Sequence, residues 1–227
     1  MHTAILEPRR FLDNFIVAPK VDRRTTEGKM TWAAFQEEAA GRIVCTDEEA
    51  EVVAGVANAM LAHPLASTLL QGGIAEHSLY WVDEETGLEC KTRPDYINED
   101  QLIDAKTSMD ASYRKFRSQI DNYEYFIQAA FQCEGFRAAF KKPVADYIWL
   151  AAETDDPYAI ALYRADEGLP DLGDQEIRKG LRIIKRCKDA DHWPSYQYDE
   201  EKDRFAVQDM GLAPWRLSND AIARSML

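Results

Sequence analysis

The chain has 227 residues, of which 46% are hydrophobic and 30% charged, and its formal net charge is −13. This length suits one globular domain with a substantial core. No apolar run reaches the about 18 residues that a membrane-spanning helix needs, and the N-terminus lacks the apolar segment of a signal peptide. The four cysteines are far apart, which argues against a zinc site or a disulfide framework and is typical of the reducing cytoplasm.

The first seventy residues are expected to be largely helical. Thr46 and Glu49 form a capping-box pattern, in which the threonine caps a helix that runs to about Ala62. The other expected segments are a helix end and an extended stretch in residues 1–20 with breaks at Pro8 and Pro19, a mobile loop over 21–30, a short amphipathic helix over 31–41, and a short helix over 64–70.

A block rich in strands follows, and it gives way to alternating helices and strands. The expected segments are strands over 75–82, 88–96 and 101–107 with a hairpin turn at 83–87, a long helix over 113–140, strands over 144–153 and 158–164, a last helix from Asp171 or Asp174 to about Cys187, and an irregular tail over 195–227. This order predicts an α/β fold with a central mixed sheet flanked by helices, in one domain over residues 1–227.

An acid and a lysine interrupt the third apolar strand. Asp104 and Lys106 lie two residues apart, so their side chains project from the same face of the strand. Asp95 lies nine positions earlier on the preceding strand. A carboxylate within an apolar strand is costly unless a cation accompanies it. The plain interpretation is a turn residue at Asp95 and a structural ion pair between Asp104 and Lys106.

The functional interpretation is a metal site that activates water. Asp95 and Asp104 would bind magnesium or manganese, because hard divalent cations prefer oxygen ligands, and the carbonyl of Ala105 would be a further ligand. Lys106 would orient the attacking water or stabilise the charge that develops on a phosphate. The spacing alone is a loose pattern.

Neighbouring residues strengthen this interpretation. Glu76 begins the strand that pairs with the Asp95 strand, although it could equally be a surface residue. Tyr125 and Gln128 share the face of the next helix that points back at the sheet. The alternative interpretation is that both side chains simply pack in the core, with the Gln128 amide hydrogen-bonded there. Five basic residues that flank the site are candidates for phosphate contacts, despite the negative net charge: Arg23, Arg24, Arg93, Arg114 and Lys115.

With these residues in view, the chain resembles a PD-(D/E)xK nuclease of the RecE exonuclease family (exonuclease VIII), which is related to lambda exonuclease. The resemblance spans nearly the whole chain. The segments that carry it are 2–8, 15–19, 23–25, 75–81, 83–87, 90–95, 103–107, 122–128 and 176–191, followed by Trp193 and Pro194. The combination is far more specific than the spacing of the acids. It implies a restriction-endonuclease-like core.

The resemblance also implies an activity and its residues. Such enzymes digest one strand of linear double-stranded DNA from its 5′ end with magnesium, and they pass the 3′ tail to a RecT-like annealing protein for recombination. They are phage- or prophage-encoded, act in the cytoplasm of the bacterial host, and form tetrameric or trimeric rings. The implied roles in this chain are metal ligation by Asp95, Asp104 and His2, support of a second metal or of the water by Glu76, catalysis by Lys106, and support of the lysine and phosphate by Tyr125 and Gln128.

One position departs from the family pattern. In relatives the metal-site histidine lies inside a helix after a longer segment, whereas here it is the second residue. Two other functions stay open from the sequence. One is another nuclease of the superfamily, such as an endonuclease or a Cas4-like exonuclease, although the cysteine spacing does not suit the iron–sulfur cluster of the latter. The other is a DNA-binding homologue without activity.

Overall fold

The computed structural model of the protein describes residues 2–196, 198–199, 204–205, 207 and 209–211. The chain divides into two compact units, residues 1–181 and 182–227. In chain order the elements are α1 (His2–Leu6), α2 (Pro8–Asn14), β1 (Phe15–Val17), α3 (Thr26–Glu38), β2 (Ile43–Cys45), α4 (Asp47–Ala62), α5 (Pro64–Leu69), β3 (Ile74–Ala75), β4 (Leu79–Val82), β5 (Glu89–Thr92), β6 (Tyr96–Asn98), β7 (Gln101–Ser108), α6 (Tyr113–Asn122), α7 (Tyr125–Phe140), β8 (Asp146–Glu153), β9 (Ile160–Arg164), α8 (Gly168–Ala190), β10 (Tyr198–Asp199) and β11 (Arg204–Phe205).

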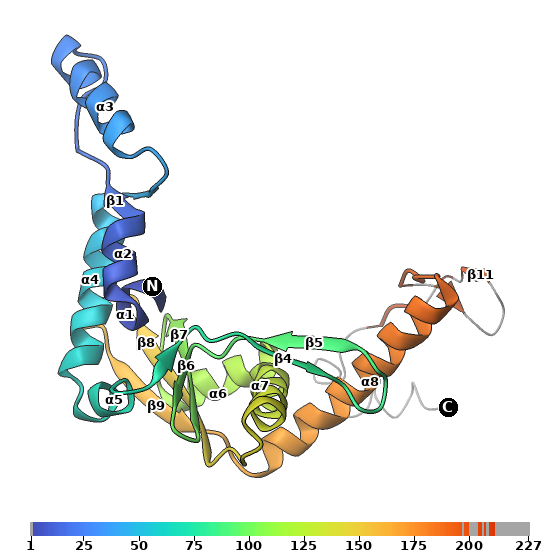
Figure 1. The fold of residues 1–227 in the computed structure, drawn as a ribbon. Helices are drawn as coiled ribbons and strands as arrows, with labels where there is room; N and C mark the ends of the chain where they lie inside the picture. The colour runs from blue at the N-terminus through green and yellow to red at the C-terminus, as the bar shows by residue number, and fades with distance from the viewer. Residues whose placement is uncertain (1, 197, 200–203, 206, 208, 212–227) are drawn as a thin grey trace. The chain divides into compact units, whose positions relative to one another are not determined.

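The first unit is built on a mixed five-stranded sheet in the order β3-β6-β7-β8-β9 (Figure 1). β7 pairs with β8 in parallel, and every other pairing in this sheet is antiparallel. β8 is buried along all but its two end residues, and β7 is buried from Leu102 to Ala105. This arrangement confirms the predicted α/β fold with a mixed sheet flanked by helices.

Alternation along β7 and β8 sends side chains into two different cores. On one face, Leu102 and Trp149 pack with Phe116 of α6 and Phe136 of α7. On the other face, Ile103 packs with side chains of α4, α5 and β8. The sheet therefore has helices on both faces, and Asp104 shares the α6–α7 face with Leu102.

The β4–β5 hairpin forms a separate two-stranded sheet beside α7 (Figure 1). Its turn closes with a hydrogen bond from the Gly87 N–H to the Asp83 carbonyl at 2.8 Å. Leu88 and Cys90 bury their side chains against Ala130 of α7 and Ile177 of α8. Arg178 joins these elements through ion pairs with the buried Asp83 and with Glu134.

The capping box that begins α4 is confirmed. The Thr46 hydroxyl accepts a hydrogen bond from the Glu49 N–H at 3.1 Å, and the Glu49 carboxylate accepts one from the Thr46 N–H at 2.8 Å. Both bonds satisfy backbone donors that the first helical turn would otherwise leave open. Val56 and Met60 on this helix are buried, as the periodicity predicts.

The expected continuous helix over 113–140 is wrong. The chain forms two helices, α6 and α7, and Glu124 between them has a left-handed backbone conformation with φ of 53°. A residue in this conformation interrupts the helical ladder of hydrogen bonds. No glycine or proline marks the position, so the sequence pattern gives no sign of the break.

Several other boundaries also differ from expectation. Residues 26–30 are helical, not a loop, because Thr25 caps α3 by accepting a hydrogen bond from the Gly28 N–H. Pro8 begins α2, since proline is tolerated at the first helical position. The last helix begins at Gly168, earlier than predicted.

The two strands expected over 75–82 and 88–96 are each split between two sheets. β3 and β6 belong to the five-stranded sheet, and β4 and β5 form the separate hairpin. Glu76 lies at the point of division with a φ of 49°, which turns the chain out of the larger sheet. The expected pairing near Glu76 is present, because its N–H donates to the Asp95 carbonyl at 2.8 Å.

The second unit contains the end of α8 and the antiparallel pair β10–β11. Most of the irregular tail expected over 195–227 lies outside the described residues. The assignment of residues 1–227 to one domain stays a prediction. Within the described part of the chain, no helix is both long and apolar enough to cross a membrane.

Replacing Glu124 by glycine is expected to stabilise the protein by roughly 0.5–1 kcal/mol, because glycine adopts positive φ at no steric cost. Urea denaturation measures the change. Asp121→Gly is the matched control: the residue is exposed within α6, so this change should lower stability by a few tenths of a kcal/mol. Equal destabilisation by both changes would contradict strain at Glu124.

Candidate functional site

The three residues of the acid–lysine pattern meet where β6 and β7 lie side by side. Asp95 immediately precedes β6, while Asp104 and Lys106 lie on β7. Tyr96 pairs with Ile103 in the β6–β7 ladder, so Asp95 lies opposite Asp104 one residue further along. The Asp95 Oδ2 accepts a hydrogen bond from the Ala105 N–H at 2.8 Å. Two carboxylates are thereby held on neighbouring strands.

Asp104 is completely buried. Its Oδ1 accepts a hydrogen bond from the Gln128 side chain at 3.0 Å, and its Oδ2 forms a close ion pair with the Lys106 ammonium. Among the described residues, Lys106 is the partner that the structure gives this Oδ2. An ionised oxygen in such surroundings retains lone pairs for a cation.

Lys106 is oriented by the helix that faces the sheet. Its ammonium donates to the Gln128 Oε1 at 3.1 Å and lies 4.9 Å from the centre of the Tyr125 ring. Gln128 thus contacts both Lys106 and Asp104. The break at Glu124 separates α7 from α6 and places Tyr125 and Gln128 at the start of α7.

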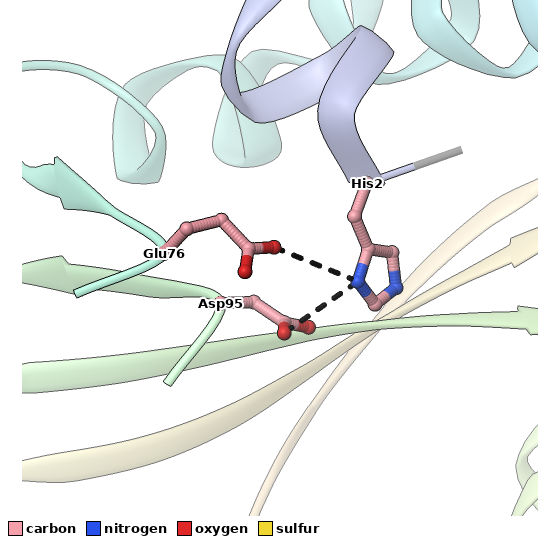
Figure 2. A group of neighbouring side chains, drawn as sticks. All are labelled: His2, Glu76 and Asp95. Carbon is pink, nitrogen blue, oxygen red and sulfur yellow. Dashed lines mark ion pairs between the residues drawn. The ribbon is translucent and has the colours of Figure 1, made fainter. Parts of the chain in front are cut away.

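His2 and Glu76 lie close to Asp95, and both carboxylates point towards the His2 ring (Figure 2). The His2 Nδ1 lies 3.5 Å from the Asp95 Oδ1 and 4.0 Å from the Glu76 Oε1. These three side chains can offer one ligand atom each, and the three atoms lie within 4.8 Å of one another, a spacing that suits a metal ion. His2 belongs to the first turn of α1, so a short helix positions it.

The Ala105 carbonyl faces the same side of β7 as its N–H. A residue in an antiparallel ladder directs both backbone groups towards one neighbour. Because the Ala105 N–H reaches Asp95, its carbonyl also lies on the Asp95 side. This orientation is compatible with the carbonyl as an oxygen ligand.

Burial disfavours the ionised forms of both carboxylates, and the charge of Asp104 further disfavours ionisation of Asp95. Burial, followed by the charge of Asp104, raises the pKa of Asp95 from its usual 3.8 to about 6, although His2 opposes this shift. Burial also raises the pKa of Asp104, against the influence of Lys106. A divalent cation between these groups would favour their ionised forms.

The histidine side of the site opens into a cavity of about 390 Å³. Its wall includes His2 and Glu76 with Arg10 and Arg93. Arg93 donates to the Glu76 Oε2 at 2.9 Å. This predicted phosphate contact is therefore adjacent to the acidic cluster formed by Glu76, Asp95 and Asp104. Arg10 is likewise paired, with Glu7 at 2.9 Å, so the cavity wall carries two arginine–glutamate ion pairs.

The other predicted phosphate contacts are not gathered at the cluster. Arg23 stacks its guanidinium 3.9 Å from the Trp32 ring centre near α3. Arg24 precedes α3, and Arg114 and Lys115 are exposed on α6. Their proposed contact with DNA stays a prediction.

Two aromatic residues that the sequence reasoning did not select lie beside Asp104. Trp149 is the register partner of Asp104 on β8, and its buried indole N–H has no hydrogen-bond acceptor among the described residues. The Tyr147 hydroxyl donates to Gln132 at 2.9 Å, and burial raises the pKa of Tyr147 well above its usual value. Their positions depend on the β7–β8 register, which the apolar sequence of β8 does not reveal.

The raised pKa of Asp95 predicts a particular dependence of stability on pH. An acid with a higher pKa in the folded protein binds more protons when folded. Its contribution to the free energy of unfolding therefore falls as the pH rises from 3.8 to about 6. Asp95→Asn, which mimics the neutral acid, should therefore gain stability relative to the wild type across this window, by up to about 3 kcal/mol.

Urea denaturation in the presence of a chelator, at several pH values between 3.5 and 7 set about one unit apart, measures this gain. Asp13→Asn, at an exposed position of α2, is the control for loss of a carboxylate. A pH-independent difference between Asp95→Asn and the wild type would contradict a raised pKa.

Comparison with solved structures shows the fold independently. A crystal structure from Eubacterium rectale, named "Putative exonuclease", aligns with a TM-score of 0.56 at 13% sequence identity and covers 81% of this chain and 72% of that chain. The crystal structure of SSO0001 aligns with a TM-score of 0.32 at 16% identity, over 78% of this chain and 86% of that chain. No curated protein matches the sequence significantly.

The family model of the PDDEXK-like domain of unknown function (DUF3799) matches residues 1–202. The match includes every element of the five-stranded sheet and all the residues of the acidic cluster. Together with the mixed sheet and the helices on both its faces, it identifies the chain as a member of the PDDEXK-like DUF3799 family.

Proposed function

We propose that the protein is a metal-dependent exonuclease that digests one strand of linear double-stranded DNA from the 5′ end and leaves 3′ single-stranded tails. The observation that carries the proposal is the convergence of Asp95, Asp104 and Lys106 where β6 and β7 lie side by side. Membership of a PDDEXK-like family and the likeness to a protein named as an exonuclease support a nuclease.

The proposed metal ligands are the carboxylates of Asp95 and Asp104, the imidazole of His2 and the carbonyl of Ala105, with Glu76 available to a second ion. The donor set is mostly oxygen, which suits Mg²⁺ or Mn²⁺. A bound divalent cation lowers the pKa of a coordinated water and stabilises charge on a phosphate. We propose two such ions in each site.

The protein groups around the ligands have complementary roles. Lys106 would hold the attacking water or the phosphate oxygen by donating hydrogen bonds. Gln128 fixes this lysine by accepting its hydrogen bond and simultaneously donates to Asp104. The Tyr125 ring, 4.9 Å from the ammonium, limits where the lysine can point.

The proposed biological setting follows from the resemblance to RecE-type exonucleases. The substrate would be a double-stranded DNA end, and the product would pass to a RecT-like annealing protein for recombination. The enzyme would be encoded by a phage or prophage, act in the bacterial cytoplasm, and assemble as a homo-oligomeric ring. An endonuclease or an inactive DNA-binding homologue would behave differently on defined substrates.

Digestion of linear duplex DNA labelled separately at each 5′ and 3′ end tests the activity. We expect early release of the 5′ label with magnesium and no release with a chelator. Cleavage of a closed circular duplex would indicate an endonuclease. Binding without metal-dependent cleavage would indicate an inactive homologue, and early loss of the 3′ label would reverse the proposed polarity.

Lys106→Ala is expected to reduce the cleavage rate by at least about 100-fold while leaving DNA binding nearly intact, because the lysine acts on the developing charge. Cleavage rates and binding by fluorescence anisotropy measure the two effects. Lys91→Ala, which removes an exposed lysine from β5, is the matched control. Full activity of Lys106→Ala would remove the catalytic role from this residue.

His2→Ala and Glu76→Gln are each expected to weaken Mn²⁺ binding by about ten-fold or more, because each removes one donor from the cluster. Isothermal titration calorimetry on the metal-free protein measures the affinity without reference to activity. Asp13→Asn is again the control. Unchanged affinity in both variants would leave Asp95 and Asp104 as the only side-chain ligands.

A further inference from the structure

A second cavity lies over β8 and β9, on the same face of the sheet as Asp104 and Lys106. Its volume is about 480 Å³, and α6, β8, β9 and the start of α8 form its wall. All of these lining residues belong to the first unit. The cavity shares no lining residue with the one beside His2 and Glu76.

Aromatic rings form much of this second cavity. Phe116 stacks on Tyr163 with ring centres 5.2 Å apart, and Tyr113 meets Tyr163 edge-on at 6.0 Å. Tyr113 is 67% exposed, so its ring is open to a ligand at the cavity mouth. Exposed rings at a cavity mouth are suited to stacking with the flat face of a base.

Polar groups in the cavity wall remain available for hydrogen bonding. Arg117 makes no ion pair or hydrogen bond with another described residue, whereas Arg164 is already paired with Asp146 at 2.8 Å. Trp149 contributes a buried indole whose N–H lacks an acceptor within the described part of the chain. The wall therefore offers a free cation, an unpaired donor and the Asp121 carboxylate as an acceptor.

The cavity is continuous with the candidate metal site through packed side chains. Trp149 lies beside Asp104 in the β7–β8 register, at the about 4.8 Å that separates neighbouring strands. Phe116 lies 6.3 Å from Tyr125, whose ring contacts Lys106. Two sets of packed side chains, Trp149 in one and Phe116 with Tyr125 in the other, therefore join the wall of the cavity to the candidate metal site.

The geometry points to a nucleotide-binding subsite in this cavity, in which Tyr113 stacks on a base and Arg117 binds the adjacent phosphate of the DNA strand. This inference rests on the proposed nuclease function and specifies how the strand is held next to the scissile bond. A base and its phosphate together match the neighbouring aromatic surface and free guanidinium better than either group alone. Trp149 and Asp121 would supply a donor and an acceptor to the base edge.

Binding of a fluorescently labelled single-stranded oligonucleotide in the presence of a chelator tests this subsite, because no metal-dependent cleavage can then occur. Tyr113→Ala should weaken binding by about 5- to 150-fold, which corresponds to the loss of one stacked base. Tyr113→Phe keeps the ring and should bind as the wild type does. Arg117→Ala should weaken binding and reduce the salt dependence by about 0.7 in logarithmic slope.

The controls are Tyr80→Ala, which removes an exposed ring from β4, and Lys142→Ala, which removes an exposed cation after α7. Competition by a deoxynucleoside monophosphate, but not by inorganic phosphate or free nucleoside at the same concentration, supports recognition of base and phosphate together. Equal competition by inorganic phosphate would overturn the role of the base.

Metal-dependent cleavage by the wild type, measured in parallel, separates this inference from the proposed function. If the wild type cleaves DNA while Tyr113→Ala and Arg117→Ala bind as well as the controls do, the subsite is rejected and the nuclease stands. If the wild type neither binds nor cleaves DNA, both are rejected.

Discussion

Two carboxylates buried opposite one another, Asp95 and Asp104, are the constraint on which the candidate site depends. Like charges directly opposite on neighbouring strands repel, and burial removes the water that would screen them. Other groups of the fold stabilise these charges. The Ala105 N–H and His2 of α1 lie against Asp95, and the Gln128 amide and Lys106 contact Asp104. These groups offset only part of the cost, as the raised pKa of Asp95 indicates.

The surrounding elements serve to hold these compensating groups. β7 lies between β6 and β8, so the backbone that carries Asp104 and Lys106 has little freedom to move. Glu76 and Glu124 both have positive φ at the points where the chain leaves the main sheet or begins α7. Such conformations are costly for residues other than glycine and persist where surrounding structure requires them. In this protein each one directs a neighbouring side chain or helix towards the acidic cluster.

The same sheet face carries both the acidic cluster and the aromatic cavity. Asp104 and Trp149 are neighbours in register. The Trp149 indole N–H is buried without a hydrogen-bond partner among the described residues, whereas the Asp104 Oδ2 is paired with Lys106. Unsatisfied buried atoms are rare in folded proteins and often mark places where a ligand or ion completes the structure. The adjacency of Asp104 and Trp149 places the proposed nucleotide subsite beside the candidate metal site, in a family whose description specifies no function.

The sequence by itself determined the class of fold, the capping of α4, and the pattern of acids and lysine on one strand. These features are local: alternation follows from the period of a strand, and a cap involves residues three apart. The separation of Asp95 from Asp104 is also local, because residues 99 and 100 close the turn between Asn98 and Gln101, which pair with each other.

Only the tertiary structure decided which distant residues complete the site. His2 reaches Asp95 through the packing of α1, and Trp149 reaches Asp104 through the register of two apolar strands. The break at Glu124 has no local signal, since tertiary packing imposed a conformation that glutamate does not favour. Contacts between residues far apart in sequence depend on packing and register, and neither leaves a periodic pattern in the chain.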